Sequence, residues 1–276
     1  MWTEAIDLHS HSTHSDGIFS VPELADRMRK QGVKVWSLTD HDTTVGWEEA
    51  LLVSEDMVFL PGVEVTCQPP LECAQSSWHV LCWFPEGCVE FREWMESKRD
   101  ERRPRMQAMV DALNELGQEI SMADVEKQAG QASLGRPHLA RAMVERGIVE
   151  SVQEAFEKWI NDEGPAFRER PLPSVEEVVQ RAHAEQGICS LAHPYWTKLE
   201  DEVLINILSE IGFDCVEAFH QSHPDSYRYR IWQAAAAHNI YCSVGADCHG
   251  TGHHPNPGRM PIPIEALHPR IAALMS

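Results

Sequence analysis

Short apolar segments alternate with longer amphipathic segments along most of the chain. The segment 20–32, SVPELADRMRKQG, has apolar residues at helical spacing, starts at a Ser with Glu three residues later, and ends at Gly. The segment 174–187, SVEEVVQRAHAEQG, has the same design. Each leads into a short apolar run typical of a buried strand, VKVWSLTD or ICSLAHP. The pattern predicts repeated strand–helix units, and therefore an α/β fold with a mainly parallel sheet, open or closed into a barrel.

Residues 93–170 break this alternation. They contain consecutive helical patterns, among them MQAMVDALNELG, SMADVEKQAG and GRPHLARAMVERG, with no strand-like run between them. We therefore expect a small helical domain at 93–170, inserted into a main domain formed by 1–92 and 171–276. Such an insertion is expected to cover the functional site.

Histidine and carboxylate residues lie at or near the ends of most predicted strands. In the first strand, DLHSH, alternation directs His9 and His11 to one face, so that two imidazoles can approach one ion. A single such residue is usually structural, but six strand ends that carry them are not explained in that way. The other candidates are His41, Glu64, His79, His193, Asp247 and His249.

Imidazole and carboxylate ligands suit zinc, manganese or iron better than calcium or copper(I). About nine candidates are too many for one catalytic ion, which usually takes three or four protein ligands. Two or three ions that share a carboxylate, for which Glu64 is the candidate, fit better. Such a cluster lowers the pKa of a bound water and neutralises charge on a phosphoryl group, so phosphate ester hydrolysis by a metal-bridging hydroxide is the leading hypothesis.

A binuclear amidohydrolase is the alternative, because it also uses a His-x-His strand. Those sites often contain a carboxylated lysine bridge, and none of the six lysines lies at a candidate strand end.

Composition narrows the possible substrates. The chain has 43 acidic and 23 basic residues, a formal net charge of −20, which argues against a broad duplex DNA surface but not against a small phosphorylated substrate. The eight cysteines form no C-x-x-C motif, and neither a signal-peptide pattern nor a membrane-spanning apolar run is present. We therefore expect a cytoplasmic protein that does not act at a membrane.

The motifs DLHSHSTHSDG, LTDHDT, GVEVT, HVL, GRPHLA, AHP and ADCHG, in this order, resemble those of the polymerase and histidinol phosphatase (PHP) family of metal-dependent phosphoesterases. The resemblance is strongest to bacterial members with a helical insertion, which dephosphorylate nucleotides or trim short oligoribonucleotides from the 5′ end. It implies a distorted (β/α)7 barrel with three divalent ions, Mn²⁺ first and Zn²⁺ or Fe²⁺ as alternatives.

The resemblance also implies how the ligands are grouped. One ion is assigned His9, His11, Glu64 and Asp247, the second Glu64, His79 and His193, and the third Asp16, His41 and His249. Two positions differ from the usual pattern. Ala246 replaces a Ser, which removes a hydroxyl but no ligand, and Cys248, between two ligands, is expected to point into the core.

Substrate-binding residues follow from the helix that begins at GRPH and from basic and aromatic residues near the strand ends. Arg136 and His138 lie at that helix N-terminus, which favours anions. Arg103 is the candidate for a second phosphate, His223 for protonating the leaving group or binding phosphate, and Trp196 for stacking on a base. The expected catalytic residues are Asp16, His41, Glu64, His193 and His223.

The expected substrates are nucleoside monophosphates, 3′,5′-bisphosphates or short single-stranded 5′-phosphorylated oligoribonucleotides. Two further hypotheses stay open. Histidinol phosphate hydrolysis is disfavoured by the helical insertion with GRPH. A metal-holding scaffold without activity is disfavoured because all nine ligand positions of the pattern are filled.

Overall fold

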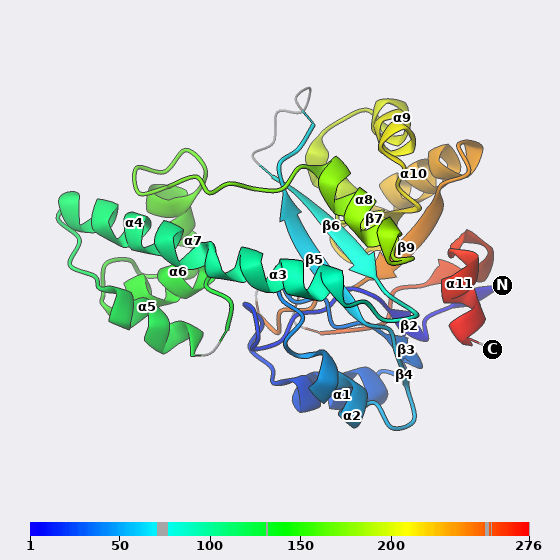
Figure 1. Cartoon of the computed structure of the whole chain (residues 1–276), viewed down its shortest axis with the longest axis horizontal. Helices are drawn as coiled ribbons and strands as arrows, with labels where there is room; N and C mark the ends of the chain where they lie inside the picture. Colours follow the sequence, from blue (N-terminus) through cyan, green and yellow to red (C-terminus); the bar gives the residue numbers. More distant parts are fainter. Residues whose placement is uncertain (71–76, 131, 252–253, 255, 276) are drawn as a thin grey trace.

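The computed structural model describes residues 1–70, 77–130, 132–251, 254 and 256–275; the side chains at 99 and 100 lie outside this description. The described strands form one five-stranded sheet, one three-stranded sheet and one two-stranded ribbon (Figure 1). The larger sheet has the order β5 (Gly62–Cys67), β6 (Trp78–Trp83), β7 (Ile188–Leu191), β8 (Cys215–His220), β9 (Tyr241–Gly245). The smaller sheet contains β2 (Ile6–Asp7), β3 (Val35–Trp36) and β4 (Val58–Phe59), all parallel, and the ribbon pairs β1 (Trp2–Thr3) with β10 (Ile262–Pro263).

Isolated contacts join the smaller sheet to β5 and β9, the two outer strands of the larger sheet. An isolated parallel bridge links His41 to Glu64, and the Leu8 amide donates to the Val244 carbonyl at 3.0 Å. The described strands therefore surround a common interior without continuous pairing, and the expected (β/α)7 barrel is not confirmed.

The larger sheet is also less parallel than the sequence pattern predicts. β7, β8 and β9 are parallel, as expected, but β6 runs antiparallel to both β5 and β7. Only residues 68–77 connect β5 to β6, and a parallel connection needs a crossover of a dozen or more residues. The long helical segment instead follows β6, where it separates β6 from β7 in the sequence.

Two of the helices begin with the predicted caps. In α1 (Val21–Lys30), Glu23 accepts from the Ser20 amide at 2.9 Å, and in α8 (Val175–Ala184) the Ser174 hydroxyl accepts from the Glu177 amide at 3.1 Å. The remaining helices of the main body are α2 (Trp47–Val53), α9 (Asp201–Ile211), α10 (Asp225–Ala237) and α11 (Pro269–Ala272). Within the described residues, no helix combines the length and apolar character needed to cross a bilayer.

The segment between β6 and β7 projects to one side of the sheets (Figure 1). It contains α3 (Glu90–Asp100), α4 (Arg102–Glu115), α5 (Met122–Ala129), α6 (Arg136–Glu145), α7 (Val152–Ala155) and a π-helical turn (Phe156–Ile160). Buried residues between Met106 and Ala166 form a hydrophobic cluster of their own. Helix α3 belongs to both parts, since Phe91 and Met95 pack into the main core. The division at residue 93 stays a prediction.

Candidate metal centre

The nine predicted ligands come together at one edge of the two sheets. His9 and His11 follow β2, His193 follows β7, and Asp247 and His249 follow β9. His79 is at the start of β6 rather than at its end. Because β6 is antiparallel to its neighbours, its start lies at the same edge as the ends of β7, β8 and β9. Strand β6 thus contributes a ligand from its first residues, whereas the parallel strands β7 and β9 contribute ligands from the residues that follow them.

The first group contains two imidazoles and two carboxylates around one point. His9 Nε2 lies 3.2 Å from Glu64 Oε2 and 3.3 Å from Asp247 Oδ1. His11 Nε2 lies 3.2 Å and 3.1 Å from the same two oxygens. Two ligands about 2.0–2.1 Å from a tetrahedral ion are about 3.4 Å apart, so these separations fit a shared cation.

The second group forms around the other oxygen of Glu64. Glu64 Oε1 lies 2.9 Å from His79 Nδ1 and 3.0 Å from His193 Nε2. Glu64 is 1% exposed, and its two oxygens face different sets of imidazoles. It is therefore placed to share two cations.

The third group lies beside Asp16. Asp16 Oδ1 is 3.2 Å from His249 Nε2, and Asp16 Oδ2 is 3.8 Å from His41 Nε2. His41 Nδ1 also lies 3.1 Å from Glu64 Oε2, so the third group is continuous with the first two. His11, Asp16, His41 and His249 offer ligand atoms that all lie within 4.8 Å of one another.

Buried polar atoms without hydrogen bonds show that this cluster fits cations. Within the described residues, His11 Nδ1, His41 Nδ1 and Glu64 Oε2 are buried and lack a partner with hydrogen-bond geometry. Such atoms are costly unless something else satisfies them. The donor set of imidazoles and carboxylates, with no sulfur, suits borderline to hard divalent ions.

The ionisation states of the two carboxylates and of His41 also fit cation binding. Burial opposes ionisation of Glu64, but His41 and His9 outweigh it and hold its pKa well below the usual range. For Asp16, burial is likewise outweighed by His249 and His41, which lower its pKa well below the usual range. Burial lowers the pKa of His41 to about 3, so that this ring is a neutral imidazole with a free lone pair. Neutral imidazoles and ionised carboxylates are the forms that bind metals, so Glu64, Asp16 and His41 are ready to bind. For His9 and His249, burial is outweighed by nearby carboxylates, which raise the pKa, to about 10 for His249, so a cation would displace a proton from these two rings.

Two ligands have left-handed backbone conformations, which are uncommon for residues other than glycine. His193 has φ 31° and Asp247 has φ 51°. Such conformations cost free energy and persist where the surrounding structure imposes them. The chain turns sharply after β7 and β9 at these residues, which aims both side chains at the cluster.

Curated relatives match the chain over most of its length. A 5′-3′ exoribonuclease from Haemophilus influenzae is 27% identical over 259 residues, with 90% of each chain covered. A 3′,5′-nucleoside bisphosphate phosphatase from Chromobacterium violaceum is 25% identical, covering 90% of this chain and 88% of the relative. A phosphoribosyl 1,2-cyclic phosphate 1,2-diphosphodiesterase from Eggerthella lenta is 27% identical, covering 88% and 94%. A comparison with family models gives no match.

Two solved structures share the fold. One, described as a metal-dependent phosphoesterase from Bifidobacterium adolescentis, has a TM-score of 0.78 and 29% identity over 92% of this chain and 90% of that chain. The other, an amidohydrolase from Chromobacterium violaceum with bound sulfate and no metal, has a TM-score of 0.84 and 25% identity over 98% and 96%.

The chain is similar over most of its length to metal-dependent phosphoesterases and to enzymes named for RNA and nucleoside bisphosphate hydrolysis, in agreement with its motif resemblance to the PHP family. Its class of reaction is the hydrolysis of phosphoric ester bonds. Divalent metal ions are the cofactors that the cluster and the family indicate.

Two further residues lie at the centre that were not among the ligands predicted from the sequence. Glu217, in β8, is fully buried, and its Oε1 lies 2.9 Å from His9 Nδ1 while its Oε2 accepts from the His193 amide at 2.7 Å. His220, also in β8, is 1% exposed, and its unpartnered Nε2 lies 3.5 Å from Asp247 Oδ2. The available signal for Glu217 was one carboxylate inside the apolar run CVEAFH.

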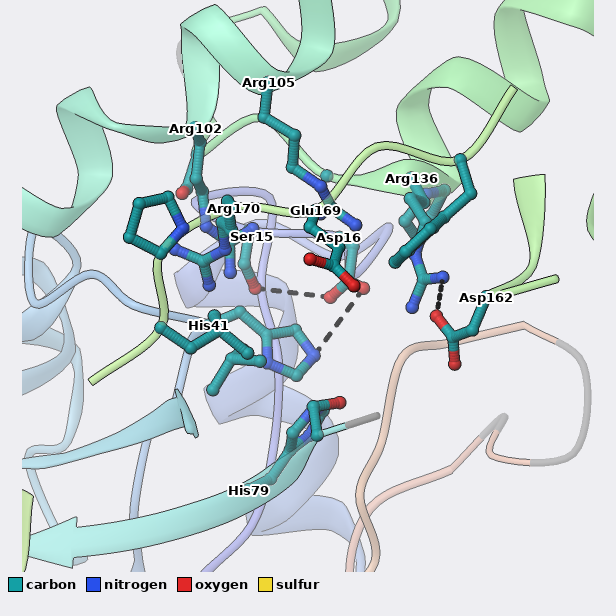
Figure 2. A pocket seen from close by; sticks show the side chains of 18 of the residues that line it. Ser15, Asp16, His41, His79, Arg102, Arg105, Arg136, Asp162, Glu169 and Arg170 are labelled. Carbon is teal, nitrogen blue, oxygen red and sulfur yellow. Dashed lines mark hydrogen bonds and ion pairs between the residues drawn. The ribbon is translucent and has the colours of Figure 1, made fainter. Parts of the chain in front are cut away.

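A cavity of about 630 Å³ opens beside His41 and His79, between the main body and the helical segment (Figure 2). Arginines from the helical segment and the following loop line it, namely Arg102, Arg105, Arg136 and Arg170. A second cavity of about 560 Å³ shares His79 and Arg136 with the first, and reaches His193 and Trp196. The two cavities therefore adjoin the same ligands.

Apart from the two histidines, some of the predicted substrate-binding residues line the two cavities, and one of them does not. Arg136 lines both cavities and pairs with Asp162 at 2.7 Å. The expectation for Arg103 is not met, because its side chain is 64% exposed and pairs with Glu126 on the outer face of α4. The neighbours Arg102 and Arg105 point into the first cavity instead (Figure 2). Trp196 lines the second cavity and is 48% exposed.

The two remaining histidines are buried near the centre but line neither cavity in the described residues. His138 is 2% exposed, and its Nδ1 accepts from the Gly135 amide at 3.0 Å, so it caps α6. His223 packs on His220 with ring centroids 4.9 Å apart, and burial lowers its pKa to about 3. A neutral His223 has no imidazolium proton to give a leaving group, which argues against that predicted role.

Proposed function

We propose that this phosphoesterase hydrolyses phosphate monoesters at the 5′ end of nucleotides, with nucleoside 3′,5′-bisphosphates and short 5′-phosphorylated oligoribonucleotides as its substrate class. One observation carries the proposal: a cluster of nine imidazole and carboxylate ligands adjoins a cavity lined by arginines. The ligands suit the phosphate that is cleaved, and the arginines suit a second phosphate of the same molecule.

Three divalent ions are proposed, with Mn²⁺ as the first candidate. His9, His11, Glu64 and Asp247 would hold one, Glu64, His79 and His193 a second, and Asp16, His41 and His249 a third. When bound, such ions lower the pKa of water and neutralise charge on the attacking and leaving oxygens of a phosphoryl group.

Residues around the ligands hold them in position. Glu217 orients His9 and fixes the backbone of His193. Asp42, next to His41 in the chain, pairs with Arg102 and Arg170, so the helical segment is bound directly to the ligand loop. The Ser15 hydroxyl donates to Asp40 Oδ1 at 2.5 Å, which fixes the loop that carries Asp16.

Arg105 is the residue best prepared for a second phosphate. Its Nε donates to the Arg168 carbonyl at 2.7 Å, and no carboxylate pairs with it in the described part of the chain. Burial and the neighbouring Arg136 and Arg170 lower its pKa to about 9. Binding of an anion beside these three neighbouring arginines would offset their mutual repulsion and is therefore favourable. We infer that Arg105 and Arg136 contact the second phosphate.

The second cavity provides space for a base. Trp196 lies at its mouth, and Lys198 Nζ is 4.7 Å from the centroid of the Trp196 ring. Aromatic rings stack on bases without strong sequence preference. A nucleotide with its 5′-phosphate at His79 and His193 would therefore extend towards Arg105 on one side and Trp196 on the other.

The relatives support this substrate class, since two of the three are named for RNA or nucleoside bisphosphate hydrolysis. A structural neighbour is described as an amidohydrolase, which corresponds to the alternative reaction. The amidohydrolase alternative is disfavoured because Glu64 lies between the ligand groups. Among the described residues, no lysine occupies that position.

The test is a phosphate-release screen with Mn²⁺ present. We expect turnover of AMP, adenosine 3′,5′-bisphosphate and short 5′-phosphorylated RNAs, with the bisphosphate or RNA favoured, and slower release from histidinol phosphate. His41→Ala is expected to reduce turnover by about 10³-fold or more while the circular dichroism spectrum is unchanged. Faster release from histidinol phosphate, an amide substrate turned over in place of esters, or full activity of His41→Ala would each contradict the proposal.

A further inference from the structure

A second group of metal-capable side chains lies at the other end of the five-stranded sheet. Cys189 is near the start of β7, and Asp214 directly precedes β8, whereas the catalytic ligands follow the ends of such strands. His183 comes from the last turn of α8, which covers this part of the sheet. Ligand atoms of His183, Cys189 and Asp214 all lie within 4.8 Å of one another.

One carboxylate oxygen connects the helix to the strand. Asp214 Oδ2 lies 2.8 Å from His183 Nε2 and accepts from the Cys189 amide, also at 2.8 Å. His183 and Asp214 are partly exposed, with 38% and 27% of their side chains accessible, while Cys189 is buried. A cation can therefore enter from the surface at α8 and meet the thiol beneath it.

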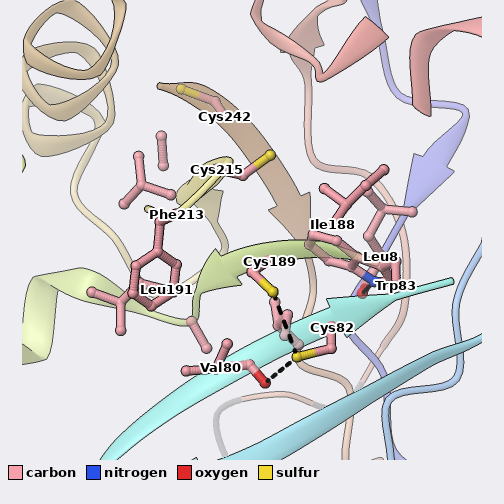
Figure 3. Close-up of a cluster of buried hydrophobic side chains, with 14 of the residues drawn as sticks. Leu8, Val80, Cys82, Trp83, Ile188, Cys189, Leu191, Phe213, Cys215 and Cys242 are labelled. Atoms are coloured by element: carbon pink, nitrogen blue, oxygen red, sulfur yellow. Dashed lines mark hydrogen bonds between the residues drawn. The ribbon is translucent and has the colours of Figure 1, made fainter. Parts of the chain in front are cut away.

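A second sulfur completes the group. Cys82 and Cys189 are direct partners in the antiparallel pairing of β6 and β7. The Ala192 amide donates to the His79 carbonyl, so hydrogen-bonded pairs alternate from there and the two cysteines form a non-hydrogen-bonded pair, in which side chains approach closely. Their Sγ atoms are 4.0 Å apart, and both residues are completely buried (Figure 3).

We propose that Cys82, Cys189, His183 and Asp214 form a zinc site separate from the catalytic centre. Two thiolates bound to one tetrahedral zinc ion at about 2.3 Å have sulfurs about 3.8 Å apart, close to the observed separation. The imidazole nitrogen and carboxylate oxygen, now in contact, would open to about 3.4 Å. The mixed sulfur, nitrogen and oxygen donors favour zinc over manganese.

Binding involves proton release and no redox change. Each thiol loses its proton to solvent as its sulfur binds the ion, and His183 binds as a neutral imidazole. A bound ion would fasten α8 to β6, β7 and the start of β8. The site shares no residue with the catalytic ligands, so its metal binding can be measured separately from the phosphoesterase reaction.

The absorption spectrum of bound Co²⁺ distinguishes this site from the catalytic centre. A thiolate bound to Co²⁺ produces a charge-transfer absorption in the near ultraviolet, and the catalytic ligands among the described residues include no sulfur. Titration of the reduced, metal-free full chain with Co²⁺ is expected to produce this band and to saturate it once Co²⁺ exceeds the proposed catalytic sites and this site together. Addition of Zn²⁺ is expected to abolish it.

Variants assign the band to its ligands. His183→Ala alters a partly exposed residue, so it should fold, lose the band and keep Mn²⁺-dependent phosphatase activity. Cys189→Ser should also lose it, whereas Cys88→Ser, the matched thiol control, and His41→Ala, at the catalytic centre, should keep it. The proposal is overturned if no band forms with Co²⁺ in excess of all the proposed sites, or if the band survives in both His183→Ala and Cys189→Ser.

Discussion

His9 Nδ1 lies 2.9 Å from Glu217 Oε1, and both side chains are fully buried. This contact assigns the proton of His9 to Nδ1 and leaves Nε2 free to face Glu64 and Asp247. A carboxylate that touches no substrate thereby determines which nitrogen of the ligand is available to a cation.

Glu217→Gln is expected to weaken binding of the ion at His9 by about 10- to 100-fold, because the amide can present its NH₂ group to His9 and no longer supports the correct tautomer. The measurement is competition of the protein with a metal-binding dye for Mn²⁺. Excess metal should restore most of the turnover. Unchanged affinity in the folded variant would argue against the orienting role.

Arg105→Met is expected to raise KM for adenosine 3′,5′-bisphosphate about 10- to 100-fold and to change KM for AMP much less. Only the bisphosphate has a second phosphate, so only this substrate would lose its contact with Arg105. Arg103→Met is the matched control, two residues away on the exposed face of α4, and should leave both values unchanged. Steady-state kinetics on the two substrates provides the test. Equal effects of Arg105→Met on both would place the second phosphate elsewhere.

Asp42→Asn is expected to lower the free energy of unfolding by about 3–5 kcal/mol, because it leaves Arg102 and Arg170, which are 11% and 5% exposed, without their shared counter-charge. Urea unfolding at pH 7 gives the value. Glu126→Gln removes one partner of the exposed pair with Arg103 and should cost no more than about 1 kcal/mol. A similar small loss for Asp42→Asn would show that the buried pairs are not important for stability.

His138 should make the protein less stable in mild acid. Burial lowers its pKa to about 4, and Nδ1 must stay unprotonated to accept from Gly135. Between pH 6.5 and 4 the unfolded chain therefore binds a proton that the folded chain does not, so stability falls as pH falls through this window. From pH 7 to pH 5 the loss is about 2 kcal/mol.

Urea unfolding of the parent and of His138→Gln at pH 7 and pH 5 isolates this contribution. The variant lacks the titrating ring, so its stability should fall by about 2 kcal/mol less over the same interval. Parallel losses in the two proteins would assign the pH dependence to other groups.

The ligand set could be predicted because strand geometry determines where its members lie. Alternation puts His9 and His11 on one face, and side chains at the ends of parallel strands meet at one edge. The direction of β6 could not be read in this way. The apolar pattern of WHVLCW is the same for either direction, and only the short connection from β5 indicates reversal.

Arg103 lies in the basic run SKRDERRPR at 97–105, which also contains Arg102 and Arg105. Which of these side chains faces the site depends on a break between two helices that the sequence does not mark clearly. Helix α3 ends at Asp100 and α4 begins at Arg102, so the helical phase is interrupted within the run. That interruption points Arg102 and Arg105 inward and Arg103 outward. Arg170 could not be connected to Asp42 at all, because 128 residues separate them and only the folded chain brings them together.

The pairing of Asp42 with arginines from both ends of the helical segment restricts how the active centre can open. Moving that segment away from His41 would break both buried ion pairs at once, so the two arginines act as a double latch between the helical segment and the ligand loop. The existing cavity beside His41 and His79 is therefore the doorway that needs no such rupture.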